Sequence, residues 1–123
     1  MVYVGTYLRA SDNSGAKTCF CIKILGNRKA AAAARLGDTV VVSVQSARSD
    51  KKIRKHDVQM GVPVRMRRRT CRFNGTTFRS HDNAIMIIDK KKNPIGTRLF
   101  GCVTHELRFR RFFKIVSMAS AVV

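Results

Sequence analysis

The chain has 123 residues, of which 45% are hydrophobic, and this is enough for a single domain, residues 1–123, with a buried apolar core. Its 25 Lys and Arg face only 7 Asp and Glu, so the formal net charge is +18, and self-repulsion on this scale predicts a polyanionic partner. No apolar run approaches the roughly 20 residues of a membrane-spanning helix. Residues 1–9 are typical of a strand rather than of a secretory signal.

Alternating hydrophobicity predicts the first two strands of a small barrel. In residues 17–25 an apolar face alternates with one that can stay wet, and we expect the apolar face to point inward; its members are Phe20, Ile22 and Ile24. Residues 40–45 repeat the pattern with an inward-facing ladder of Val40, Val42 and Val44. Between these strands lies an alanine run, residues 30–34. Alanine favours helix, but the flanking residues are typical of loops, so we expect a loop with at most one helical turn.

A longer apolar run predicts a third strand. It keeps a period of two and should form another inward-facing ladder of Val58, Met60, Val62, Val64 and Met66. Pro63 cannot donate a hydrogen bond to a neighbouring strand, so we expect an edge or a bulge at that point. Residues 84–88 are apolar at every position, which is typical of a strand buried on both faces.

A hairpin and a C-terminal helix complete the predicted elements. Asn74-Gly75 favours a type I′ turn, which needs two residues that tolerate positive φ, and this turn should join residues 68–73 to residues 76–79. Near the C-terminus the period changes from two to about 3.6. One helical face then collects Phe109, Phe112, Phe113 and Val116. We therefore expect a helical segment at about residues 104–119 that packs on the barrel.

Groups suited to catalysis are sparse. Five acids border expected strands, where turn and cap roles come first: Asp12, Asp38, Asp57, Asp82 and Asp89. Three histidines have neither metal-ligand spacing nor a neighbouring nucleophile motif: His56, His81 and His105. No glycine-rich phosphate loop follows a strand and opens a helix. The sequence therefore does not predict an enzyme, and a small basic nuclease is disfavoured because it would need a catalytic pair.

The cysteines predict free thiols in a reducing compartment. There is no CxxC pair, and a domain with this core does not need disulfides. Cys19 and Cys21 point the same way on one expected strand, whereas Cys71 and Cys102 lie far away in sequence. Zinc sites usually have tighter ligand spacings. We therefore expect no metal and no cofactor.

Cations form four dense clusters with little acid between them. The first precedes the strand at Val58 and comprises Arg48, Lys51, Lys52, Arg54 and Lys55. The second leads into and out of the hairpin and comprises Arg65, Arg67, Arg68, Arg69, Arg72 and Arg79. The third is Lys90, Lys91 and Lys92, and the fourth is Arg108, Arg110 and Arg111. A single run of this kind would be a solvated surface, but four of one sign indicate an RNA-binding surface. Arginine suits phosphates and unpaired bases, whereas a lipid surface favours an amphipathic basic helix, so RNA is preferred to a membrane.

Longer strings resemble one family in order and spacing. They are Asp12-Asn13-Ser14-Gly15-Ala16, Cys21-Ile22-Lys23-Ile24-Leu25-Gly26, Leu36-Gly37-Asp38, Asp82-Asn83-Ala84 and Pro94-Ile95-Gly96-Thr97-Arg98-Leu99-Phe100-Gly101. From near Thr6 to Val122 the chain resembles the family of the universal large-subunit ribosomal protein number fourteen. The string Val103-Thr104-His105-Glu106-Leu107-Arg108 is more similar to the bacterial and organellar type than to the eukaryotic cytosolic type.

The resemblance implies a mostly-β fold: a small five-stranded β-barrel with a projecting β-hairpin and short C-terminal helices. It implies a structural constituent of the large ribosomal subunit that binds large-subunit rRNA on the face toward the small subunit. It also implies inter-subunit bridges to small-subunit rRNA and contacts with the large-subunit proteins numbered three and nineteen. The alternative is a free-standing regulatory RNA-binding protein, which would expose aromatic side chains for base stacking. We expect four aromatic side chains to be buried instead: Phe20, Phe109, Phe112 and Phe113.

The resemblance also implies a protein-docking site. Thr97, Arg98 and Lys114 match the surface that a ribosome-silencing factor grips in this family; the alternative is that the two cations hold rRNA phosphate. The family usually has an aromatic residue within the loop at residues 30–34 and a glycine at the position of His56, so contacts there should differ. The extra arginines at residues 67–72 imply a locally different rRNA surface. Such loop differences and the high charge favour a mitochondrial ribosome, while bacterial cytoplasm and plastid also fit.

Overall fold

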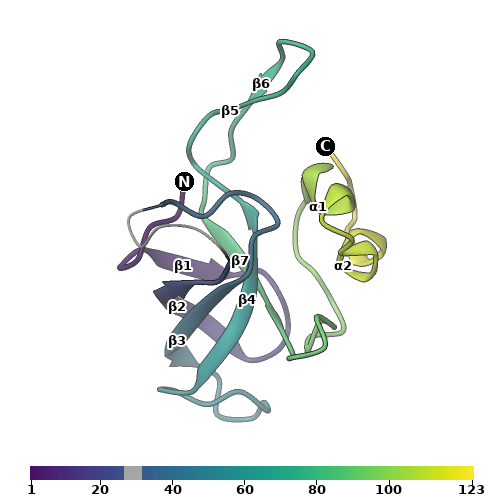
Figure 1. Cartoon of the computed structure of the whole chain (residues 1–123). Coiled ribbons are helices and arrows are strands. Elements are labelled where there is room, and N and C mark those ends of the chain that lie inside the picture. Colours follow the sequence, from purple (N-terminus) through teal and green to yellow (C-terminus); the bar gives the residue numbers. More distant parts are fainter. Residues whose placement is uncertain (27–31) are drawn as a thin grey trace.

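The computed structural model describes residues 1–26 and 32–123. In chain order these contain β1 (Tyr7–Ala10), β2 (Ala16–Ile24), β3 (Val40–Ala47), β4 (Val58–Arg65), β5 (Thr70–Cys71), β6 (Thr77–Phe78), β7 (Ala84–Ile88), α1 (Glu106–Phe109) and α2 (Phe113–Met118). Strands β1, β2, β3, β4 and β7 close into a barrel, from which the β5–β6 hairpin projects, with the two helices beside it (Figure 1). The expected mostly-β fold is confirmed.

Strand β1 closes the barrel. It pairs antiparallel with β2 and parallel with β7, where Arg9 lies opposite Ala84 and Ala10 lies opposite Ile85. Each of the five strands therefore has two hydrogen-bonded neighbours. Closure removes the free strand edges of an open sheet and makes the barrel a rigid support for its loops.

The barrel interior confirms the expected inward ladder of β3. Val40, Val42 and Val44 are fully buried, and their neighbours on the strand are only half-buried. Complete burial of one valine side chain contributes about 1.5–3 kcal/mol. This ladder is therefore a main source of the stability of the barrel.

The face of β2 that points into the barrel is the opposite of the one expected. Cys19 and Cys21 are fully buried, whereas Ile22 is 42% exposed and Phe20 and Ile24 are half-buried. The Phe20 ring packs edge-to-face against a tyrosine ring of β1, with ring centroids 5.1 Å apart. A period of two is compatible with either face, and the small thiols fit beside the valines of β3 in the crowded interior. The prediction of the strand is confirmed, and the prediction of its inward face is wrong.

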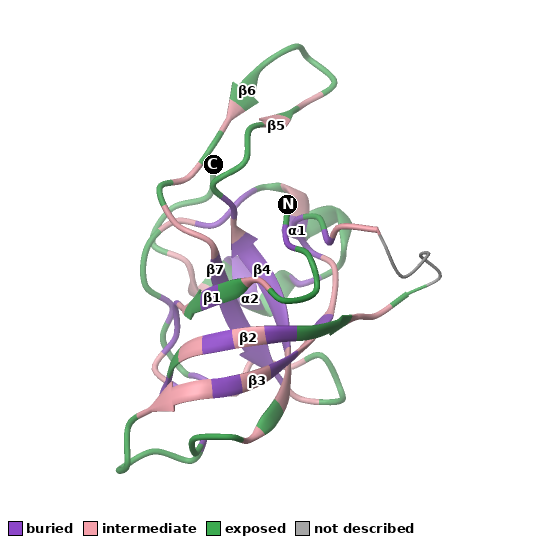
Figure 2. Cartoon of the chain, turned by 90° about the vertical axis from the view of Figure 1, so that its left-hand side faces the viewer, coloured by how far each residue is buried: buried purple, intermediate pink, exposed green. Residues whose placement is uncertain are grey.

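A second apolar core lies between the barrel and the C-terminal helices. Strand β7 faces both cores, because Ile85 and Ile87 join the barrel interior while Ala84, Met86 and Ile88 join the core under the helices. All five residues are buried, and the ribbon of β7 is coloured purple in Figure 2. The expectation of a strand buried on both faces is confirmed.

Strand β4 keeps its period of two, but its apolar ladder faces the second core. Val62 and Val64 are fully buried against the cluster that contains the helices, and Val58 at the start of the strand is 62% exposed. Gly61 faces the barrel interior instead. A Cβ atom there would lie 2.5 Å from the side chain of Ile85, so only glycine fits. The ladder predicted for the barrel interior is therefore wrong in its direction for Val62 and Val64, whereas Met66, just after the strand, is buried in the barrel core as expected.

The irregularity expected at Pro63 is present and positions an arginine. The register against β7 shifts between Pro63 and Arg65, and such a bulge re-aims the side chain that follows. The Arg65 guanidinium donates to both carboxylate oxygens of Asp82, at 3.0 and 3.2 Å. It also donates to the main-chain oxygens of Phe100 and Cys102, at 2.8 and 3.1 Å. Arg65 thus ties β4 to the segments before β7 and α1.

The β5–β6 hairpin has a three-residue loop rather than the expected type I′ turn. Among its residues only Gly75 is left-handed, with φ of 82°. The Gly75 N–H donates to the Arg72 oxygen (3.0 Å) and the Arg72 N–H donates to the Thr76 oxygen (2.9 Å). This is the pattern of a turn followed by a glycine bulge. Asn74 leaves the left-handed role to glycine because its side chain accepts hydrogen bonds from the Thr76 N–H (3.1 Å) and hydroxyl (2.6 Å).

The C-terminal segment forms two short helices within the expected residues 104–119, as the resemblance implied, where the periodicity alone predicted one. Arg111 has φ of 63°, which ends the first helix. The break changes which side chains face the second core. Phe112 is buried, but Phe109 and Phe113 are 77% and 61% exposed, so the expectation that all three are buried is wrong. Aliphatic side chains of both helices fill the core in their place.

Residues 27–31 lie outside the described part of the chain, so the run at residues 30–34 is described only from residue 32. Residues 32–34 are not helical, in line with the expected loop. Ala34 is described and exchanges two main-chain hydrogen bonds with Val2, at 2.7 and 3.2 Å. No helix in the described ranges is long and apolar enough to cross a membrane.

Replacing Arg65 by alanine should lower the free energy of unfolding by about 2–3 kcal/mol, because a carboxylate and two main-chain oxygens lose one shared donor. The Arg65 side chain is only 12% exposed, so water replaces it poorly. Urea denaturation at neutral pH measures the loss. Arg67→Ala is the matched control, because Arg67 is exposed, and it should change stability by less than about 0.5 kcal/mol.

The cost of Arg65→Ala should also depend on pH. The hydrogen bonds and charge of Arg65 lower the pKa of Asp82 from its ordinary value of 3.8. Stability from a lowered carboxyl pKa is fully present above the ordinary value and is lost as the pH falls through the folded-state value. The difference between the wild type and Arg65→Ala should therefore shrink in strong acid. A variant as stable as Arg67→Ala at neutral pH would contradict this role of Arg65.

Candidate nucleic-acid interface

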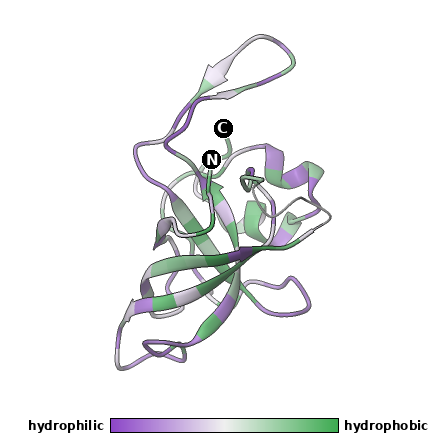
Figure 3. Cartoon of the chain, turned by 60° about the vertical axis from the view of Figure 1, so that its left-hand side comes forward, coloured by the Kyte–Doolittle hydropathy of each residue, from purple (hydrophilic) through white to green (hydrophobic). Residues whose placement is uncertain are grey.

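The cations expected to bind RNA lie mainly on loops and on the hairpin. All of them are exposed except Arg65 and Arg72, which are half-buried. Figure 3 shows the barrel strands as largely hydrophobic, with hydrophilic segments on the loops and toward the hairpin. The fold therefore separates a packed apolar frame from a cationic surface.

The first cluster occupies the loop between β3 and β4, and this loop is held at several points. The Arg48 N–H donates to the Gly15 oxygen (2.8 Å), so the loop returns to the turn between β1 and β2. The Asp57 carboxylate accepts the N–H of Arg54 at 2.9 Å. His56 has φ of 69°, and its N–H donates to the β3 main chain at 2.7 Å. The backbone that carries these cations is thus ordered by internal hydrogen bonds.

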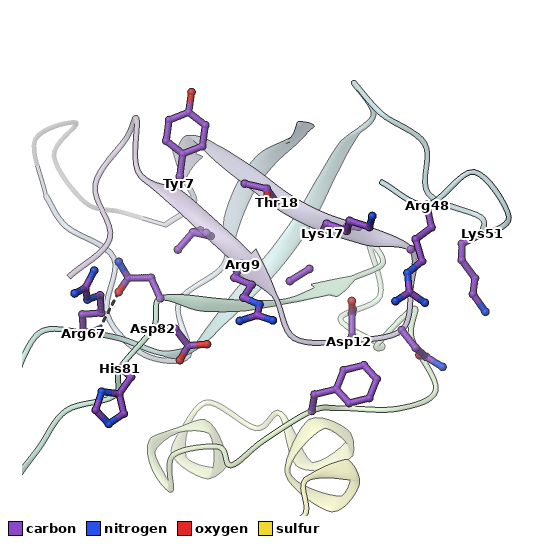
Figure 4. A pocket seen from close by; sticks show the side chains of 17 residues that line it. Tyr7, Arg9, Asp12, Lys17, Thr18, Arg48, Lys51, Arg67, His81 and Asp82 are labelled. Atoms are coloured by element: carbon purple, nitrogen blue, oxygen red, sulfur yellow. Dashed lines mark hydrogen bonds between the residues drawn. The ribbon is translucent and has the colours of Figure 1, made fainter. Parts of the chain in front are cut away.

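A surface hollow of about 700 Å³ gathers cations from separate segments (Figure 4). We call it the basic hollow, and its cations are Arg9, Lys17, Arg48, Lys51 and Arg67. They come from β1, β2, the β3–β4 loop and the start of the hairpin. Same-sign charges converging on one concave surface focus the field and attract a polyanion.

Sequence reasoning missed two members of the basic hollow. Arg9 and Lys17 are single cations within strands, so they form no run that stands out. Arg9 lies opposite Thr18 in the β1–β2 register, which brings it beside Lys17. The available signal was their position on the outward face of two adjacent strands, and it needs the pairing register to be read.

The acids that line the basic hollow are engaged inside the protein. Asp12 is buried and accepts hydrogen bonds from the Ser14 hydroxyl (2.6 Å) and the Ile87 N–H (3.1 Å). Burial raises the pKa of Asp12, and these hydrogen bonds oppose the rise. The Asp82 carboxylate is paired with Arg65. The field in the hollow is therefore dominated by its cations.

Three arginines predicted to bind RNA form ion pairs within the fold. Besides Arg65, Arg72 lies 2.8 Å from a carboxylate oxygen of Glu106. Arg110 lies 3.3 Å from a carboxylate oxygen of Asp38. Arg65 is the most enclosed of the three, whereas half of the Arg110 side chain is exposed. We assign Arg65 and Arg72 to structural support first.

The third cluster is confined to one turn after β7. The Lys92 N–H donates to the Asp89 oxygen (3.0 Å), and Lys92 has φ of 63°. Lys90, Lys91 and Lys92 are all exposed there. None of the three lines the basic hollow. The fourth cluster surrounds α1, where Arg108 and Arg111 are exposed with Arg110.

The residues of the expected protein-docking site are exposed and their loop is braced. The Asn13 side chain accepts the N–H groups of Thr97 (2.8 Å) and Arg98 (3.0 Å). It also donates to the Thr97 hydroxyl at 2.9 Å. Lys114 on α2 donates to the Asn93 side-chain oxygen at 2.7 Å. The structure thus fixes the backbone of residues 97–98 and leaves their side chains at the surface.

The thiols are poorly suited to metal binding. Cys19 and Cys21 are fully buried, while Cys71 is exposed and Cys102 is half-buried. Burial raises the pKa of Cys19 to about 12, with a smaller contribution from Asp12, and burial also raises the pKa of Cys21. Protonated thiols are weak ligands and weak nucleophiles. No group of three metal-ligating side chains occurs within residues 1–26 and 32–123.

The whole chain, residues 1–123, matches the family model described as ribosomal protein L14p/L23e. The chain belongs to this family. The resemblance read from the sequence strings is therefore confirmed. Membership makes the chain a structural constituent of the large ribosomal subunit that binds rRNA and has ribosomal-protein partners. The family is of a structural, non-enzymatic kind, and it accounts for the cationic surface on a rigid barrel.

Charge reversal to Glu at Arg67, Arg68 and Arg69 together should weaken binding to an rRNA fragment more than the same change at Lys90, Lys91 and Lys92. Arg67 lines the basic hollow and arginine binds phosphate through a two-pronged fork, so we expect a roughly tenfold larger loss. Both triple variants change the net charge equally, so the loss of non-specific electrostatic attraction to RNA should be the same in both. Filter binding at one salt concentration provides the comparison. Equal losses would count against the hairpin as a principal contact.

Proposed function

We propose that this ribosomal protein lies on the face of the large subunit toward the small subunit. There its cations bind large-subunit rRNA and contribute to bridges with small-subunit rRNA. The observation that carries the RNA contact is the basic hollow, where cations from several segments converge while the lining acids are engaged internally. The bridging role is supported by the resemblance of the chain to its family.

The mechanism is neutralisation and positioning. Phosphates of neighbouring rRNA helices repel one another, and a fixed array of cations between them lowers that repulsion. The closed barrel holds the array in place, so little conformational entropy is lost when RNA binds. The protein does not need to transform a substrate for this role.

A free-standing regulatory RNA-binding protein is the alternative function. Phe109 and Phe113 were expected to be buried, and their exposure supports this alternative because exposed aromatic rings can stack on bases. Exposed aromatics serve RNA binding equally well inside a ribosome. Family membership favours the ribosomal setting.

The neighbouring proteins and the type of ribosome are proposed from the resemblance to the family. We expect the large-subunit proteins numbered three and nineteen as neighbours. A mitochondrial ribosome is favoured by the high positive charge and the differences at residues 30–34 and His56, and a bacterial or plastid ribosome is the alternative. Purification of ribosomes from each compartment of the source cell, followed by mass spectrometry, identifies the host particle.

Binding of the isolated protein to an rRNA fragment should be steeply salt-dependent. If several phosphates are neutralised, affinity should fall by about a thousandfold between low and moderate salt. We also expect little sequence preference, because phosphate contacts carry no sequence information. Fluorescence anisotropy titrations over a salt series measure the slope. An affinity that stays flat across the series would refute phosphate neutralisation as the basis of binding.

The surface of Thr97, Arg98 and Lys114 is a docking site for a ribosome-silencing factor, and occupation of this surface would block subunit joining. The bracing by Asn13 supports this, because a fixed backbone presents Arg98 in a constant position. Arg98→Glu with Lys114→Glu should weaken the affinity of the factor for purified large subunits at least about tenfold, since the charge complementarity is reversed. Unchanged affinity with intact subunits would reject the docking role and leave rRNA phosphate as the partner of these cations.

A further inference from the structure

A second hollow, of about 550 Å³, lies between the β5–β6 hairpin and α1. We call it the hairpin cleft, and its lining includes Phe73, Phe109, Arg35, Arg68, Arg69 and Arg110. Sites for small organic groups commonly have volumes of roughly 300–1,000 Å³. The hairpin cleft is therefore large enough for a nucleobase.

Arg72 fixes the geometry of the hairpin cleft. It donates to both carboxylate oxygens of Glu106 on α1, at 2.8 and 3.3 Å, and to the main-chain oxygen of Val123 at 2.6 Å. Its guanidinium also lies 4.3 Å from the ring centroid of Phe78 on β6. These contacts join the hairpin to the helices on the opposite side of the cleft. The two walls are thus held in position before any ligand binds.

Two aromatic rings in the hairpin cleft have faces open to solvent. Phe73 at the hairpin tip is fully exposed, and Phe109 on α1 is 77% exposed. The Phe109 ring makes an edge-to-face contact with the neighbouring His105 ring, with centroids 5.4 Å apart, and still leaves most of its surface to solvent. Two exposed phenylalanines at one cleft form an apolar surface of the kind that marks contact with a partner.

The charge of the hairpin cleft favours a phosphate-bearing partner. Its lining acid, Glu106, is already paired with Arg72. In the described ranges, no carboxylate lies within ion-pair distance of Arg35, Arg68 or Arg69. The Arg68 guanidinium donates to the Met1 sulfur at 3.2 Å, which leaves its charge without a carboxylate partner in the described ranges. Aromatic rings beside such guanidinium groups match the chemistry of single-stranded RNA, whose bases stack on rings and whose phosphates accept arginine donors.

We propose that the hairpin cleft binds an unstacked base of RNA. Phe73 and Phe109 stack on the base, and the arginines of the cleft contact the flanking phosphates. This inference rests on the proposed RNA-binding function and adds a site that distinguishes single-stranded from paired RNA. A base within a duplex is already stacked and paired, so duplex RNA binds the cationic surface without entering the cleft.

The test compares a short single-stranded RNA that carries one 2-aminopurine with an RNA duplex of equal length, both with the full-length protein. Phe73→Ala and Phe109→Ala should each weaken single-strand binding about fivefold or more and change duplex binding by less than about twofold. Stacking should also change the 2-aminopurine fluorescence with the wild type and not with Phe73→Ala. Phe113→Ala is the matched control, because Phe113 is exposed on α2 and does not line the cleft.

Two further variants separate stacking from general apolar contact. Phe73→Trp should retain single-strand affinity, and Phe73→Leu should lose it. Unchanged single-strand affinity in Phe73→Ala, or retention in Phe73→Leu, would overturn the stacking site, as expected if a neighbouring protein fills the cleft. Duplex binding tests the proposed function separately from the cleft. Duplex binding that does not depend on salt would refute RNA binding by phosphate neutralisation. Salt-dependent duplex binding, together with unchanged single-strand affinity of Phe73→Ala, would refute the cleft alone.

Discussion

Arginine–carboxylate pairs within the fold hold the projecting parts of this protein on its barrel. Arg65 ties the base of the hairpin to the segment before β7, and Arg72 ties the hairpin to α1. Exposed pairs contribute only about 0–1 kcal/mol each, so the enclosed Arg65 pair contributes more than the half-exposed Arg110 pair. These contacts brace the hairpin, which carries Arg67, Arg68 and Arg69 on its first arm.

The same pairs shape the electrostatic surface. A chain with 7 acids and 25 Lys and Arg could neutralise patches of its own surface, but most of its acids are used internally, and Asp50 is an exposed exception. Asp12 is buried, Asp57 and Asp89 hold turns, and Asp82 and Glu106 pair with arginines. The outer surface is left cationic. Stability and RNA binding therefore use different members of one set of charges.

The sequence predicted where the strands and helices lie better than it predicted which of their faces is buried. Strand β7 was predictable because every position is apolar, so no choice of face arises. For β2, a period of two allows either face, and only packing against β3 selects Cys19 and Cys21. The helix pattern did not reveal the break at Arg111, which exposes Phe109 and Phe113. These differences all depend on tertiary contacts that a local pattern does not contain.

The candidate site was predictable to the extent that its cations occur in runs. Arg9 and Lys17 line the basic hollow because the strand register brings them together. Arg65 is not an exposed cation, because a bulge turns its side chain inward.

The most direct test of the central claim is sedimentation of ribosomal subunits from cells that express an epitope-tagged chain. We predict that the tag sediments with the large subunit at low salt. A tag that remains with free RNA or in the unassembled fractions would contradict the account.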